Sequence, residues 1–127
     1  MLTSQQSMTY SGSVNSGERN AVRIEVLSIE DCPNSRLALA ETEAALASLG
    51  LSAIPVIERR VTSPADAAAI AFAGSPTVLI DGADVIPGTM PTGNLACRIY
   101  RTETGTAGYP SRTQIVHAIR ARTDAQT

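Results

Sequence analysis

One cysteine lies where a strand-like segment, residues 22–29, meets a helix-like segment, residues 36–49. At the first turn of a helix, unpaired backbone N–H groups and the helix dipole favour a thiolate over a thiol. Pro33 suits the first helical position, which makes Cys32 the expected N-cap residue. We therefore interpret Cys32 as a reactive thiol, although the carboxylates of Glu30 and Asp31 would raise its pKa by like-charge repulsion.

The second cysteine, Cys97, alternates with Leu95 and Ile99 in residues 95–100, a segment that fits a strand and a helical turn equally well. It is therefore either buried apolar filler or a second functional thiol. A disulfide with Cys32 would require Cα atoms within about 7 Å of each other. Asp31 is either a proton donor beside Cys32 or a solvated turn residue.

The remaining polar residues predict no metal centre. The chain has a single histidine, His117, which we expect to be solvated or half-buried on the last helix. Nothing in the spacing gathers it with both cysteines and a carboxylate, as a zinc site would require. Tyr100 and Arg101 are interpreted as surface or packing residues.

The elements that would position these groups follow from periodicity and turn residues. Residues 53–61 are a strand, placed at a sheet edge because Pro55 cannot donate to a ladder. Ser63 caps a helix that runs to Gly74. Residues 77–80 and 83–86 are strands joined by the turn Asp81-Gly82. Crossovers through helices predict that the first three strands are parallel and that the hairpin adds an antiparallel strand.

The last predicted element is a helix from a capping box, Ser111 with Gln114, to about residue 122. Its buried stripe would be Ile115, Ala118 and Ile119. We expect one domain over residues 21–123, with a disordered segment at 1–20 and a flexible tail at 124–127.

Composition narrows the function classes. The chain has 127 residues, a net charge of −2 and 3% aromatic residues, so we expect no nucleic-acid partner. No apolar run approaches the roughly 18 residues of a membrane span. These observations predict a cytoplasmic protein without a membrane partner. Its cysteines would be reduced or catalytic rather than a structural staple. The oligomeric state stays open.

Three motifs resemble the thioredoxin superfamily, over residues 22–88. They are Cys32-Pro33-Asn34-Ser35 at the strand-to-helix turn, Gly74-Ser75-Pro76-Thr77 before the third strand, and the hairpin Val78-Leu79-Ile80-Asp81-Gly82. The resemblance implies an α/β, thioredoxin-like fold, β-α-β-α-β-β-α, with a glutaredoxin-like core and a central mixed four-stranded sheet. It also implies a cis-proline at Pro76 that faces Cys32.

The resemblance implies thiol–disulfide exchange with Cys32 as nucleophile. The backbone of Ser75 would pair with a disulfide-containing protein, a small thiol or glutathione. The substrate-binding residues would be Pro33, Ser35, Ser75, Pro76 and Thr77. Ser35 replaces the usual second cysteine, which leaves Cys97 as the candidate resolving thiol. The cation for a glutathione carboxylate would be Arg36, Arg59 or Arg60.

The segment Cys97-Arg98-Ile99-Tyr100 is similar to a narrower group, small bacterial thioredoxin-like proteins often labelled alkylmercury lyase. Lyase chemistry needs two cysteines and an aspartate, and this chain offers Cys32, Cys97 and Asp31. Two thiolates would also suit a soft ion such as Hg(II) or Cu(I). A non-catalytic binding module is the remaining alternative.

Overall fold

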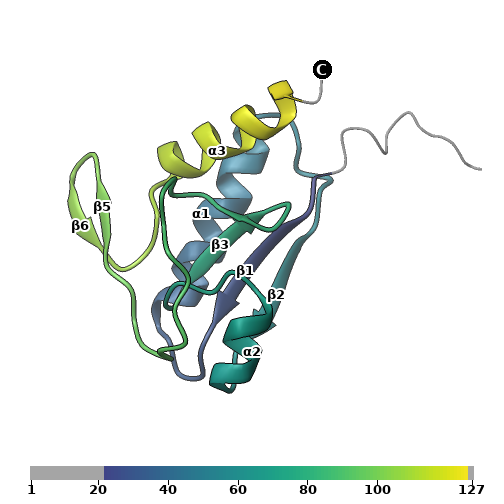
Figure 1. Ribbon diagram of the computed structural model, residues 1–127. Helices are drawn as coiled ribbons and strands as arrows, with labels where there is room; N and C mark the ends of the chain where they lie inside the picture. The colour runs from purple at the N-terminus through teal and green to yellow at the C-terminus, as the bar shows by residue number, and fades with distance from the viewer. Residues whose placement is uncertain (1–21, 126–127) are drawn as a thin grey trace, which may run out of the picture.

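A four-stranded mixed sheet lies at the centre of the computed structural model, which describes residues 22–125 (Figure 1). The strand order is β2-β1-β3-β4. The strands are β1 (Ile24–Ser28), β2 (Val56–Arg60), β3 (Thr77–Ile80) and β4 (Ala83–Asp84). The predicted edge position of the second strand is confirmed, and Pro55 lies just before it. The predicted disorder of residues 1–20 lies outside the described residues.

The direction of β3 corrects the sequence prediction. β2 runs parallel to β1, but β3 runs antiparallel to it, so the expectation of three parallel strands is wrong. The helix between them, α2 (Pro64–Ala69), has six residues and rises only about 9 Å. It ends at Ile70, which is extended, and does not reach Gly74. The chain therefore re-enters the sheet at the end where it left, with Thr77 opposite Leu27.

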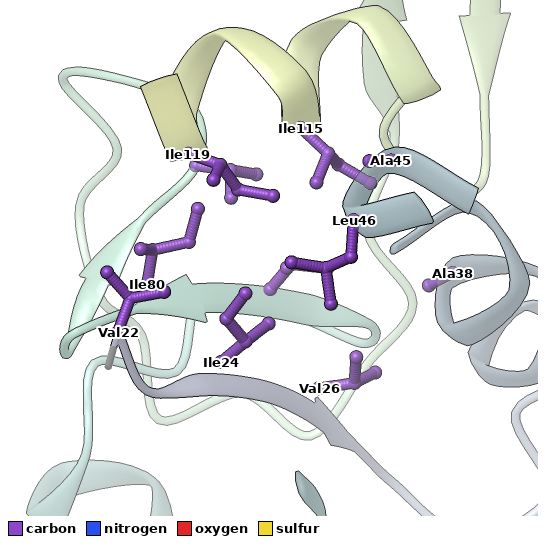
Figure 2. Packing of buried hydrophobic residues seen from close by; sticks show 11 residues of the cluster. Val22, Ile24, Val26, Ala38, Ala45, Leu46, Ile80, Ile115 and Ile119 are labelled. Atoms are coloured by element: carbon purple, nitrogen blue, oxygen red, sulfur yellow. The ribbon is translucent and has the colours of Figure 1, made fainter. Parts of the chain in front are cut away.

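One face of the sheet packs against helices α1 (Asn34–Ser48) and α3 (Arg112–Ala125). Alternate side chains of β1 and β3 point into this core because successive strand residues face opposite sides of a sheet. In Figure 2, Ile115 and Ile119 of α3 point toward Ile24 and Ile80 of the sheet, and Leu46 of α1 joins them. The predicted burial of Ile115 and Ile119 is confirmed, whereas Ala118 is half-buried.

The other face of the sheet carries a smaller core beneath α2. Leu27 and Leu79 point to this side and contact Phe72, Val61 and Ala67. Phe72 is the only phenylalanine of the chain and is fully buried. Phe72 directly precedes residues 73–77, which lead into β3, so this core holds the start of β3 in place.

The C-terminal third contains a hairpin that the sequence interpretation missed. Strands β5 (Tyr100–Thr102) and β6 (Gly105–Ala107) pair antiparallel beside the main domain (Figure 1). Their turn residues, including Gly105, predicted only a loop. α3 begins at the predicted capping box, since Ser111 and Gln114 exchange backbone-to-side-chain hydrogen bonds of 2.9 and 3.1 Å. α3 continues to Ala125, so residues 124–125 of the predicted tail are helical, and residues 126–127 lie outside the described residues.

Two further predictions concern exposure and membranes. His117 is exposed on α3, as expected for a solvated histidine. Across residues 22–125, none of the helices combines the length and the apolar character needed to cross a membrane.

Candidate functional site

Cys32 directly precedes Pro33, the N-cap residue of α1, and is 9% exposed. Pro33, not Cys32, is the N-cap residue, which shifts the predicted helix start by one position. The carbonyl of Cys32 accepts hydrogen bonds from the backbone N–H and the hydroxyl of Ser35, at 3.3 and 3.0 Å. Ser35 stands where the second cysteine of the thioredoxin-like motif would be, and its hydroxyl is hydrogen-bonded to the backbone carbonyl of Cys32.

Asp31 lies on the surface in the turn between β1 and α1. Its φ of +62° is in the left-handed region, which aspartate tolerates better than most residues. The side chain is exposed, as is that of the neighbouring Glu30. Asp31 thus has the position predicted for a solvated turn residue, and its predicted catalytic role rests on proximity to Cys32 along the chain.

Hydrogen bonds within residues 73–77 fix the conformation of the loop that leads into β3. The peptide bond between Ser75 and Pro76 is cis, as predicted. The hydroxyl of Thr77 donates to the carbonyl of Gly74 at 2.5 Å and accepts from the N–H of Ala73 at 3.0 Å. The Thr77 hydroxyl therefore donates and accepts its hydrogen bonds within the loop, and Thr77 is fully buried.

Ser75 connects this loop to the turn that carries Cys32. Its hydroxyl oxygen accepts a hydrogen bond of 3.1 Å from the backbone N–H of Ile29, three residues before Cys32. Ser75 is fully buried. Three residues span at most about 10 Å, so Cys32 lies close to this contact.

Cys97 is exposed, so its interpretation as buried filler is wrong. Ile99, its neighbour in the expected alternation, is 77% exposed. The segment is neither a regular strand nor a helix, because it forms a single parallel bridge with Ser75. The N–H of Ser75 donates to the carbonyl of Ala96 at 2.8 Å, and the N–H of Arg98 donates to the carbonyl of Ser75 at 2.9 Å.

A buried polar cluster holds this segment in place. The guanidinium of Arg98 donates to both carboxylate oxygens of Asp84, at 2.8 and 3.2 Å, and to the hydroxyl of Thr89 at 3.1 Å. The Arg98 and Asp84 side chains are only 10% and 9% exposed. A fork-to-carboxylate pair of this kind fixes orientation as well as position.

Tyr100 completes the cluster from the start of β5. The guanidinium of Arg98 lies 4.2 Å from the centre of its ring, a cation–π contact. The hydroxyl of Tyr100 donates to the carbonyl of Pro76. Burial raises the pKa of Tyr100, against the opposing influence of the Arg98 charge, so the phenol stays a donor at neutral pH. Tyr100 is 2% exposed and belongs to the site, whereas Arg101 is exposed.

Ser75 is thus the residue that both cysteine-bearing segments contact. Its side chain bonds to the turn before Cys32, and its backbone brackets Cys97. The sequence interpretation had given no role to Arg98 or Asp84. The one available signal was Arg98 within the motif Cys97-Arg98-Ile99-Tyr100, because an arginine between alternating apolar residues needs a partner when buried.

Two other kinds of candidate site are a cavity and a metal-binding group. A hollow of about 910 Å³ lies between the β3–β4 hairpin, β5 and α3, and neither cysteine lines it. Among residues 22–125, no group of three or more histidine, cysteine or acidic side chains is arranged to hold a metal ion.

The chain was compared with protein-family models, with curated proteins and with solved structures. None of the three comparisons gave a significant match.

Proposed function

We propose that this is a thioredoxin-fold thiol protein that carries out thiol–disulfide exchange with Cys32 as nucleophile and Cys97 as resolving thiol. The observation that supports this most is the position of Ser75, which contacts the segments of both cysteines. Both cysteines are free thiols. The thioredoxin-like fold is supported by Cys32 at the start of α1 and by the cis bond at Pro76.

In the proposed reaction the thiolate of Cys32 attacks one sulfur of a disulfide R–S–S–R. A Cys32–S–S–R bond forms, and the leaving RS⁻ takes up a proton. The thiolate of Cys97 then attacks the Cys32 sulfur, releases the second RS⁻ and leaves a Cys32–Cys97 disulfide. The substrate gains two electrons, the protein loses two, and an external dithiol restores the reduced protein.

The same two sulfurs would bind a soft ion such as Hg(II), or would take part in alkylmercury-lyase-like chemistry together with Asp31. Both alternatives require the two cysteines to act as a pair. Exchange is preferred to lyase-like chemistry because the carboxylate of Asp31 is on the surface in a turn, and because exchange needs no third residue.

The stoichiometry of thiol release tests the exchange proposal. With hydroxyethyl disulfide, we expect the wild type to release two small thiols for each disulfide consumed and to keep no adduct, because Cys97 resolves the first adduct. Two independent thiols would instead release one small thiol for each disulfide consumed and keep the other as an adduct. Cys97→Ser should stop after one release and keep a mixed disulfide on Cys32. Cys32→Ser should react only at the ordinary rate of an exposed thiol, and the double serine variant supplies the blank. Release by Cys32→Ser at the wild-type rate would rule out Cys32 as the nucleophile.

A further inference from the structure

The backbone of Ser75 is already fully paired within the chain. Its N–H is bonded to the carbonyl of Ala96 and its carbonyl to the N–H of Arg98, at 2.8 and 2.9 Å. Extended peptides dock onto proteins by pairing with free backbone groups of this kind, as an added strand does at a sheet edge. At Ser75 no such groups remain, because residues 96–98 occupy the place that an added strand would take.

This occupying segment is anchored by the side chains of Arg98 and Tyr100. The guanidinium of Arg98 is hydrogen-bonded to Asp84 and Thr89. The Cβ of Arg98 packs closely on Gly74, since a Cβ added to residue 74 would lie only 2.9 Å from it. Tyr100 bonds to the carbonyl of Pro76 from the other side. Two anchors on a short stretch of chain make spontaneous release of residues 96–98 costly, since release would leave Asp84 buried without its partner.

We propose that residues 96–98 are a built-in occupant of the Ser75 backbone, and that this restricts the external substrates of the Cys32–Cys97 pair to small thiol-reactive compounds. Glutathione and extended peptides would have to displace the segment to gain backbone hydrogen bonds. A compact disulfide needs no such pairing in order to be attacked by Cys32. This inference rests on the proposed exchange function and names its substrate class.

The test compares two disulfides, glutathione disulfide and hydroxyethyl disulfide, as the ratio of their reaction rates. Releasing the segment should raise the rate with glutathione disulfide about tenfold, the ordinary yield of two backbone hydrogen bonds. Both rates are measured for the first step alone, the attack by Cys32, in a Cys97→Ser background, because release of the segment also moves residue 97. The readout is the ratio of the rate with glutathione disulfide to the rate with hydroxyethyl disulfide, which should rise by the same factor. The releasing variants are Tyr100→Phe and the double variant Asp84→Asn with Arg98→Gln. The double variant preserves the net charge, so a change in attraction for the anionic tripeptide is excluded.

The matched control is Glu41→Gln with Arg112→Gln, which removes an exposed ion pair remote from Ser75 and should leave the ratio unchanged. A ratio that stays at the wild-type value in folded releasing variants would overturn the inference. A wild type that already prefers glutathione disulfide would overturn it equally.

A second measurement does not depend on the variants or on any reaction. The amide hydrogens of Ser75 and Arg98 should exchange slowly with solvent in the wild type, because both are donors in the bridge. Fast exchange at Arg98 would show that the segment does not occupy Ser75. If neither disulfide reacts at Cys32 in any variant, the exchange function fails, while the amide protection still decides whether Ser75 is occupied.

Discussion

Replacing Arg98 by methionine is expected to lower the free energy of unfolding by about 3–5 kcal/mol. The physical reason is the fate of Asp84, whose side chain is 9% exposed and would lose both hydrogen bonds from the guanidinium. The carboxylate would keep only the hydrogen bond of 2.9 Å from the backbone N–H of Ile86. A buried carboxylate without a cationic partner carries a large desolvation cost. Urea unfolding with linear extrapolation measures the difference.

Two variants separate this cause from a general loss of packing. Arg98→Met combined with Asp84→Leu should recover most of the lost stability, since an apolar pair can replace a buried ion pair with little cost. Arg112→Met breaks the exposed pair with Glu41 and should cost at most about 1 kcal/mol. If Arg98→Met costs no more than Arg112→Met, the buried cluster does not hold the Cys97 segment.

Gly74→Ala is expected to destabilise the protein by about 2–6 kcal/mol. Two effects add at this position. Its φ of +106° is one that residues with a side chain rarely adopt, which costs roughly 1–3 kcal/mol. The new Cβ would also lie 2.9 Å from the Cβ of Arg98, and such overpacking adds about 1–3 kcal/mol. Relief of the collision would push residues 97–98 away from Ser75.

Gly105→Ala is the matched control for the collision. Gly105 has a similar φ of +125°, but an added Cβ there meets nothing within 4 Å. Thermal and urea unfolding should therefore show a smaller loss for Gly105→Ala than for Gly74→Ala. Only Gly74→Ala should also speed amide exchange at Arg98. Equal losses in the two variants would mean that Arg98 does not pack against residue 74.

Features that depend on neighbouring residues could be predicted from the sequence. The hydroxyl of Ser63 accepts the N–H of Asp66 at 3.1 Å, which is the cap expected at the start of α2. The capping box at Ser111 is formed as expected, and Gly50, with φ +72°, ends α1. In each case the bonding groups lie within four residues, so the local sequence contains the information.

Features that depend on distant segments could not be predicted in the same way. The direction of β3 depends on where residues 61–76 return to the sheet, which a short α2 decides and periodicity does not reveal. The position of Cys97 depends on its bridge to Ser75 and on the pairing of Arg98 with a residue 14 positions away. The alternation of Cys97 with Leu95 and Ile99 fits a strand and a helical turn equally well, and the single bridge to Ser75 is neither.

The sequence therefore indicated one part of the candidate site and not the other. Cys32 and the cis bond at Pro76 came from recognisable motifs. The cluster of Asp84, Arg98 and Tyr100 could be found only in the three-dimensional structure. The residue pattern fits a surface role and a packing role for Tyr100 equally well, and it fits both a buried filler and a functional thiol at Cys97. The structure buries Tyr100, which agrees with its interpretation as a packing residue, and exposes Cys97, which excludes its interpretation as buried filler.

The most direct test of the account is peptide mapping by mass spectrometry, without reduction, after mild oxidation of the purified protein. The central claim is that Cys32 and Cys97 form one two-thiol site around Ser75. It predicts a peptide pair joined by a Cys32–Cys97 disulfide within a single chain, formed readily and reversed by a dithiol. The opposite result would be Cys32 found only as mixed adducts with the added reagent, with no Cys32–Cys97 peptide, and it would contradict the claim.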